Sequence, residues 1–135
     1  MAENKIEQYL IDLKYGYEEV KPNIWLLNEA DNDLGGMVIM YAEPLVVFQV
    51  QVMNAPEQNR QAFYKKLLEL NASEMIHGAY GLEGEKVVIT DSLQYETLDY
   101  DEFRASLDAI SLALNQHYPI LSVFREQNPS EEVKK

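Results

Sequence analysis

The spacing of apolar residues predicts one helix at the start of the chain and another in its middle. Over residues 3–14 apolar side chains recur at i, i+3, i+4 and i+7, which places them on one stripe of a helix that Gly16 ends. Asn54 and Glu57 are spaced as a capping box, so the second helix is predicted to run from there to Leu70. Its apolar face is wider than contact with one sheet requires, which would allow contact with another protein.

A third helix is predicted after residue 99. Asp99 and Glu102 repeat the capping-box spacing, and Pro119 should end or kink the helix after Tyr118. Apolar residues beyond the proline indicate a short helical continuation. The apolar stripe of this helix consists of Phe103, Leu107, Ile110 and Leu114.

Five runs rich in aliphatic, aromatic and β-branched residues predict strands. The first three form a meander, and its last turn is placed at Glu43-Pro44 because a continuous central strand does not tolerate proline. The last two form a hairpin around Gly84. The runs cover residues 17–27, 36–42, 45–53, 76–82 and 86–93.

The resulting element order is α-β-β-β-α-β-β-α. This order predicts an α+β fold, a two-layer sandwich in which the helices cover one face of an antiparallel sheet. The opposite face would then be solvated or bound. We expect a single domain over residues 1–126 and a disordered acidic tail over residues 127–135. A chain of 135 residues can bury roughly two-thirds of its unfolded surface in one core.

Charge and composition narrow the class of partner. The chain has 23 acidic and 11 basic residues, a net charge of −12, so nucleic acid and anionic membranes are not expected as ligands. A basic or apolar partner fits this charge better. The absence of cysteine excludes disulfides, thiol nucleophiles and thiolate metal sites. The chain starts without an apolar signal core and has no membrane-spanning run, which predicts a cytoplasmic protein.

Residues that could carry catalysis do not form a recognisable set. His77 and His117 are the only imidazoles, and no carboxylates lie near them at ligand spacing. Glu29, Asp31 and Asp33 alternate as in a calcium loop, but the glycine and glutamate that such a loop requires are missing. We therefore expect no enzymatic activity, no cofactor and no metal. A small-ligand binder that uses His77 or the acidic loop is one alternative.

Two further features leave their interpretation open. Residues 83–108 carry eight acidic and two basic side chains, which form either a solvated face or a field that steers a basic partner. Met37, Met40 and Met53 lie on or beside the meander, where they would fill the core or adapt to apolar partners. Trp25 could likewise be a core residue or a binding anchor.

The second half of the chain carries a series of short apolar motifs. They resemble those of the class I type III secretion chaperones, which include the Tir chaperone family and the related YbjN-like proteins. The resemblance covers residues 54–114, while the first fifty residues agree mainly in element order. The motifs are Leu67-Leu68-Glu69-Leu70-Asn71, Gly78-Ala79-Tyr80-Gly81-Leu82, Lys86-Val87-Val88-Ile89-Thr90, Leu93, and Leu98 through Phe103.

The resemblance implies a small acidic protein, usually a homodimer, that binds an extended or partly unfolded segment of another protein and has no catalytic site. It also implies a two-fold interface on the second helix and the next strand, built by Phe63, Tyr64, Leu67 and Tyr80. The alternative is a regulatory or scaffold domain that recognises one folded partner. Candidate residues for binding the partner segment on the sheet are Trp25, Met37, Ile39, Val46, Phe48 and Val50.

Overall fold

The computed structural model describes residues 4–28 and 34–126. Its elements follow the order α-β-β-β-β-α-β-β-α, which confirms the α+β class and adds one strand to the predicted order. The elements are α1 (Lys5–Asp12), β1 (Tyr17–Lys21), β2 (Ile24–Leu27), β3 (Val38–Ala42), β4 (Leu45–Asn54), α2 (Arg60–Ser73), β5 (Ala79–Glu83), β6 (Lys86–Gln94) and α3 (Tyr100–Glu126).

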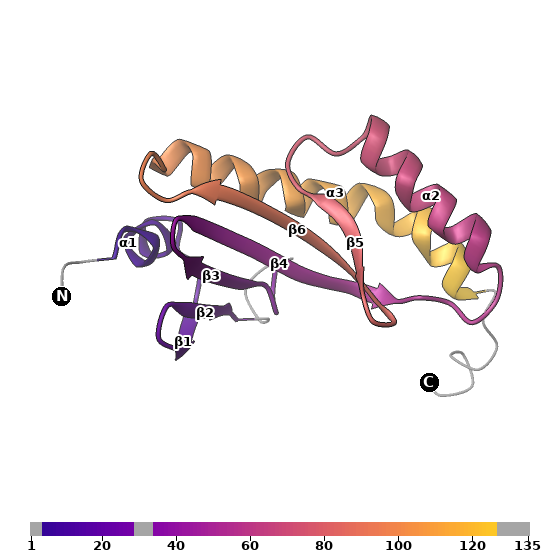
Figure 1. The fold of residues 1–135 in the computed structure, drawn as a ribbon, viewed down its shortest axis with the longest axis horizontal. Coiled ribbons are helices and arrows are strands. Elements are labelled where there is room, and N and C mark those ends of the chain that lie inside the picture. Colours follow the sequence, from indigo (N-terminus) through magenta and orange to yellow (C-terminus); the bar gives the residue numbers. More distant parts are fainter. Residues whose placement is uncertain (1–3, 29–33, 127–135) are drawn as a thin grey trace.

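The strands form a single antiparallel sheet with the helices packed on one face. The strand order is β1-β2-β3-β4-β6-β5, so the hairpin β5-β6 joins the meander through β6. Figure 1 shows α3 running along the sheet, with α2 near the β5 end and α1 at the opposite end. The predicted two-layer sandwich is therefore confirmed.

Two predicted boundaries are wrong. The run over residues 17–27 is two strands, because the chain turns at Pro22 and Asn23, where Asn23 has a left-handed φ of 66°. The second helix begins at Arg60 instead of Asn54. Asn54 is the last residue of β4, where it pairs with Lys86, so the sheet ladder outcompetes the local capping pattern.

The predicted start of α3 and the predicted helical continuation beyond Pro119 are both confirmed, although the helix does not end at Tyr118. The Glu102 amide donates to Asp99 Oδ1 at 2.8 Å and the Asp99 amide donates to Glu102 Oε1 at 3.2 Å, which is a complete capping box. The helix then continues through Pro119 to Glu126. Contacts beyond the proline stabilise this continuation, because Leu121 is buried and the Phe124 ring lies 5.2 Å from that of Phe63.

The core fills the space between the helices and one face of the sheet. Along β4 buried and more exposed residues alternate, as expected for a strand with one covered face. Phe48 from β4 lies 5.5 Å from Phe103 of α3, and Tyr9 of α1 packs on the same Phe103 ring at 5.3 Å. Residues of α1, α2 and α3 all belong to this core, and in the described part of the chain no helix covers the other face of the sheet.

Candidate functional site

The helix-free face of the sheet carries apolar side chains on three neighbouring strands. The register places Ile24 opposite Met40 and Met40 opposite Val47, so these residues form one cross-strand row. They are only half-buried, in contrast to their neighbours on the helix-covered face. The open-face patch, as we call it, consists of Ile24, Leu26, Val38, Met40, Leu45 and Val47.

The six residues that the sequence suggests for partner binding lie on the helix-covered face instead. Each is at most 3% exposed and belongs to the hydrophobic core. The helices cover this face of the sheet, so binding through these side chains stays a prediction that the fold does not favour. The residues are Trp25, Met37, Ile39, Val46, Phe48 and Val50.

The structure answers the question about Trp25. Its side chain is 1% exposed, and the indole Nε1 donates a hydrogen bond to Glu7 Oε2 of α1 at 2.8 Å. The polar end of the ring is thus satisfied inside the fold. Trp25 is therefore a core residue that fastens α1 to β2. Among the methionines of the meander, Met37 and Met53 are buried, whereas Met40 lies in the open-face patch.

The residues expected at a two-fold interface lie where α2 packs on the end of the sheet. Phe63, Leu67 and Tyr80 are buried inside this contact, and Tyr64 is half-buried at its margin. The first three therefore hold α2 and β5 together within one chain. They can support an interface from beneath but do not present their side chains to a second copy.

The side chain of Asn71, at the end of the apolar motif of α2, binds the backbone of β5. Its Oδ1 accepts from the Tyr80 amide at 2.7 Å, and its Nδ2 donates to the Tyr80 carbonyl at 3.2 Å. This side chain therefore satisfies both backbone groups of Tyr80 on edge strand β5. The Asn71 motif is visible in the sequence, but this function is not, because the bonded strand residue lies nine positions away.

Exposed apolar side chains lie on the outer side of the same unit. Leu68 is 67% exposed, Ile76 is 85% exposed and Leu82 is 49% exposed. They come from α2, from the connection between α2 and β5, and from β5 itself. We call these three residues the α2–β5 outer patch, and each is more exposed than any residue that the sequence suggests for dimer formation.

A buried pair of polar side chains joins β5 to α3. The Tyr80 hydroxyl lies 2.7 Å from His117 Nδ1, and within residues 4–28 and 34–126 the buried His117 Nε2 has no hydrogen-bond partner. Burial lowers the pKa of His117, while the nearby charge of Glu74 opposes this shift. Burial also raises the pKa of Tyr80 to about 12. His117 lies inside α3, which continues beyond it to Glu126, and its ring is bonded to Tyr80 of β5.

The remaining chemical candidates are not brought together. Glu29, Asp31 and Asp33 lie outside the described residues. His77 lies in the connection before β5, on a different element from His117. Within residues 4–28 and 34–126, no group of three or more His, Asp or Glu side chains is close enough to hold a metal ion.

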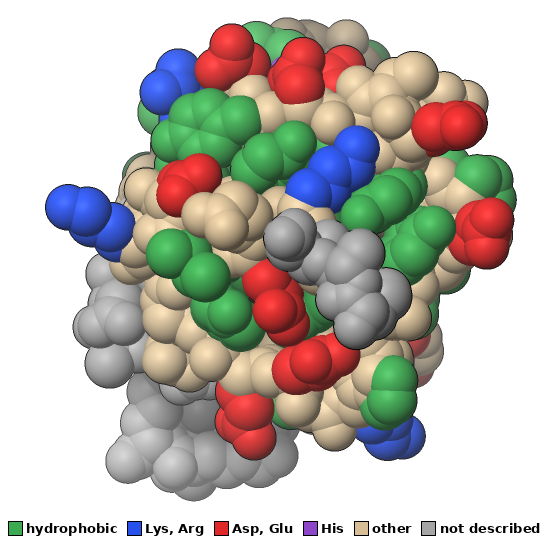
Figure 2. All heavy atoms as spheres, turned by 90° about the vertical axis from the view of Figure 1, so that its left-hand side faces the viewer, with side chains coloured by type: hydrophobic (Ala, Val, Ile, Leu, Met, Phe, Trp, Pro, Cys, Tyr) green, Lys and Arg blue, Asp and Glu red, His purple; other side chains and the backbone are tan. Residues whose placement is uncertain are grey.

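An aromatic pair and a lysine occupy the end of the molecule that carries α1. The rings of Tyr41 and Tyr95 stack at 4.3 Å, and Lys5 Nζ lies 4.6 Å above Tyr95 while donating to the Leu98 carbonyl at 3.0 Å. Figure 2 shows acidic side chains distributed among apolar ones on this side of the molecule. Both interpretations of the acidic stretch, a solvated face and a steering field, stay open.

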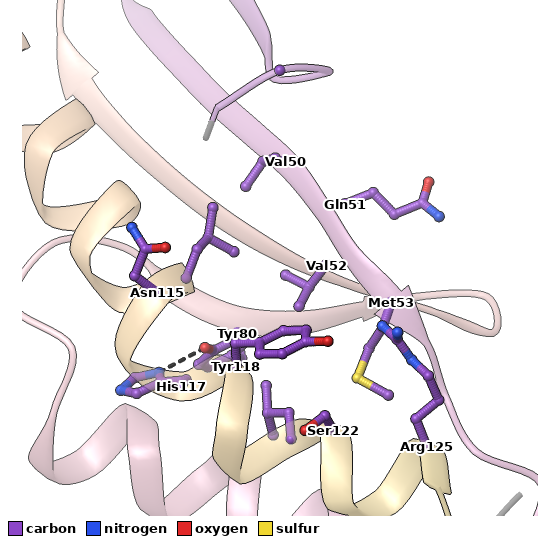
Figure 3. A pocket seen from close by; sticks show the side chains of 13 residues that line it. Val50, Gln51, Val52, Met53, Tyr80, Asn115, His117, Tyr118, Ser122 and Arg125 are labelled. Carbon is purple, nitrogen blue, oxygen red and sulfur yellow. Dashed lines mark hydrogen bonds between the residues drawn. The ribbon is translucent and has the colours of Figure 1, made fainter. Parts of the chain in front are cut away.

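A pocket of about 280 Å³ lies between α3 and the last part of β4. Its walls include Val50, Val52 and Met53 of β4. Figure 3 shows Tyr118 and Arg125 reaching from α3 toward Met53, while the side chain of Gln51 points away from the pocket. We call this cavity the α3–β4 pocket.

Two solved structures share this fold. YbjN from E. coli, a proposed transcription regulator, has a TM-score of 0.65 at 20% identity, covering 85% of this chain and 90% of that one. The ExoU–SpcU complex from the type III secretion system of Pseudomonas aeruginosa contains a chain with a TM-score of 0.69 at 16% identity, covering 86% of this chain and 97% of that one. No curated protein sequence is similar enough to count as a relative.

None of the helices in the described ranges is both long and apolar enough to cross a bilayer.

The sequence itself shows the family. The family model CesT_Tir_1, which describes type III secretion chaperones, matches residues 1–127. This match extends over the open-face patch, α2, the β5-β6 hairpin and α3 alike. The chain therefore belongs to the CesT/Tir family of type III secretion chaperones.

Proposed function

We propose that this protein is a non-enzymatic, chaperone-like module that holds an extended or partly unfolded segment of a partner protein. The open-face patch is the observation that carries the proposal. It leaves a row of apolar side chains on three strands half-exposed, and contiguous exposed apolar surface usually marks a site of protein contact. Family membership and the structural likeness to a complex of ExoU and SpcU support the same role.

The proposed active form is a homodimer joined through the α2–β5 outer patch. Leu68, Ile76 and Leu82 are exposed apolar side chains of α2, of β5 and of the connection between them, and in the proposed dimer a two-fold axis brings them against their own copies. Asn71 occupies the backbone groups of Tyr80, so continuous strand pairing between two β5 edges is hindered there. The interface is therefore built from side chains, with Tyr64 at its margin.

Binding to an unfolded chain tests the function. The probe is reduced, carboxymethylated α-lactalbumin, which stays unfolded, and its native form is the comparison. We expect the protein to bind the unfolded form and not the native form, with binding measured by fluorescence anisotropy. The alternative, recognition of a folded partner, predicts no binding to the unfolded probe, and that result would refute the proposal.

A pair of variants locates the binding surface. Met40→Gln with Val47→Thr removes apolar contact from the patch while keeping side-chain shape, and should weaken binding about tenfold because roughly 1–2 kcal/mol of apolar burial is lost. Leu112→Gln is the matched control, since Leu112 is an exposed apolar residue on α3. Equal weakening by both changes would count against the open-face patch.

A further inference from the structure

A cavity of about 350 Å³ lies where the turn between β3 and β4 meets the connection from β6 to α3. A backbone hydrogen bond fastens these two segments together, because the Tyr95 amide donates to the Pro44 carbonyl at 2.9 Å. We call this cavity the Tyr41–Tyr95 pocket. Two aromatic rings, two carboxylates, one ammonium and one proline line it, from Lys5, Tyr41, Glu43, Pro44, Tyr95 and Glu96.

The aromatic rings of the pocket already hold one cation, which comes from the chain itself. Tyr41 stacks on Tyr95 with 4.3 Å between the ring centroids, and Lys5 Nζ lies 4.6 Å from the Tyr95 centroid. Rings this close leave no room for an ammonium between them, so Lys5 lies on the face of Tyr95 that is turned away from Tyr41. Among the described residues, no further ring or cation lies over Tyr41.

The two carboxylates of the pocket are not neutralised by a neighbouring cation. Glu43 and Glu96 are exposed, and neither forms an ion pair with any residue in the described ranges. The ammonium of Lys5 donates to the backbone carbonyl of Leu98 instead. Burial raises the pKa of Tyr41, and the charges of Glu43 and Glu96 raise it further, so both carboxylates act on this ring. The pocket therefore combines an aromatic ring with two unpaired negative charges.

This combination selects a guanidinium over other side chains. A guanidinium is planar and stacks on an aromatic ring, and its N–H groups bind a carboxylate through two parallel hydrogen bonds. An ammonium group cannot make both contacts in this way. The net charge of −12 attracts basic segments, and Figure 2 shows acidic side chains spread over this end of the molecule.

The pocket adjoins the surface proposed for partner binding. Leu45 of the open-face patch directly follows Pro44 of the pocket wall, and it pairs with Gln94, which directly precedes Tyr95. A segment that lies on the open-face patch can therefore continue around this end of the sheet to the pocket.

We infer that the Tyr41–Tyr95 pocket binds an arginine side chain of the partner protein, with the guanidinium stacked on Tyr41 and hydrogen-bonded to Glu43 or Glu96. This inference rests on the proposed function and adds a chemical requirement for the partner. The open-face patch supplies apolar contact, and the pocket selects segments that carry arginine beside an apolar stretch.

Three pools of capped decapeptides test the inference on the full chain. In each pool serine alternates with Val, Ile, Leu or Phe, and one serine position, varied within the pool, carries arginine, lysine or citrulline, which has the shape of arginine without its charge. At 0.15 M salt the arginine pool should bind about tenfold more tightly than the citrulline pool, and the lysine pool should lie between them. In NMR spectra the arginine pool should shift the backbone amides of Tyr41 and Glu96.

Two double variants separate the pocket from the general negative field of the protein. Glu43→Gln with Glu96→Gln removes both charges of the pocket at exposed positions, so the arginine and citrulline pools should bind about equally. Glu18→Gln with Glu69→Gln removes the same net charge from exposed positions of β1 and α2 and should keep the tenfold preference.

Three results would overturn the inference. They are equal binding of the arginine and citrulline pools to wild type, equal binding of the arginine and lysine pools, and the same loss of preference in both double variants. None of these results touches the proposed function if wild type still binds unfolded α-lactalbumin. Conversely, a wild type that prefers the arginine pool but does not bind the unfolded protein would contradict the proposed function and leave the arginine site in place.

Discussion

At the scale of single residues, His117 lies in a buried environment that disfavours a charge. Its Nδ1 is bonded to the Tyr80 hydroxyl, and its Nε2 is buried without a partner among the described residues. A proton on this ring would add a charge that only Glu74 partly balances. The folded state therefore favours the neutral imidazole, and its pKa is lower than the ordinary value of 6.5.

This environment predicts acid sensitivity. As pH falls through 6.5, the histidine of the unfolded chain takes up a proton that the folded chain resists, so the unfolded state binds more protons. The free energy of unfolding should therefore fall on acidification, and it should fall less in His117→Gln. Urea unfolding at several values of pH between about 7 and 5 measures the difference.

The second histidine provides the control for this prediction. His77 lies in a connection between elements, so His77→Gln should keep the pH dependence of wild type. If His117→Gln and wild type lose stability in parallel on acidification, the buried imidazole does not cause the acid sensitivity.

Residue patterns predicted which segments are strands but not which side of each strand faces the core. Ile24 and Trp25 are neighbours of similar hydrophobicity, yet Trp25 is buried and Ile24 lies in the open-face patch. The side chains of a strand alternate, so the assignment depends on which face the helices cover. Packing between distant segments determines which face the helices cover. The sequence pattern does not contain this information, so it places large apolar residues at the binding surface that the fold buries in the core.

At the scale of elements, local signals were reliable only where no distant strand competed. The box of Asp99 and Glu102 forms as predicted, because all of its hydrogen bonds lie within one turn. Asn54 and Glu57 have the same spacing, but Asn54 belongs to β4 through its pairing with Lys86. The pairing of β4 with β6 bridges segments about forty residues apart and is not encoded in the local pattern.

Asn71 predicts a measurable contribution to the docking of α2 on β5. Asn71→Ala leaves the amide and carbonyl of Tyr80 without this partner, so it should lower the free energy of unfolding by about 1–3 kcal/mol. Gln61→Ala, at an exposed position of the same helix, should change stability by less than about 0.5 kcal/mol. Urea unfolding of both variants checks the prediction. If Asn71→Ala and Gln61→Ala lower the free energy of unfolding equally, the two bonds from Asn71 to Tyr80 do not stabilise the docking of α2 on β5.

At the scale of the whole molecule, the described chain presents two separate apolar surfaces. The open-face patch lies on β2, β3 and β4, whereas the α2–β5 outer patch lies on α2, on β5 and on the connection between them. The family and its element order could be predicted from the sequence, because the apolar motifs of residues 54–114 are continuous in the chain. The surfaces could not be predicted from the sequence, because each combines residues from elements that only folding brings together.

The proposed dimer predicts opposite outcomes for two substitutions in α2. Leu68→Asp places a charge in the α2–β5 outer patch and should give a folded monomer, because Leu68 is 67% exposed in one subunit. Phe63→Asp should instead unfold the chain, since Phe63 is buried. Sedimentation at micromolar concentration should show wild type near twice 15.6 kDa.

The control for the dimer is Leu112→Asp, which adds the same charge to an exposed position of α3 and should stay dimeric. A wild type that sediments as a monomer would contradict the proposed homodimer without affecting the role proposed for the open-face patch.

Oxidation of Met40 tests whether the partner segment binds on the open-face patch. Met40 is half-buried in the open-face patch, so dilute hydrogen peroxide should convert it to the sulfoxide at a measurable rate in the free protein. Saturation with unfolded α-lactalbumin should slow this reaction, while Met75, half-buried near the end of α2, should react as before. Mass spectrometry of the digested protein reports both rates. Unchanged oxidation of Met40 in the bound state would contradict binding through the open face of the sheet.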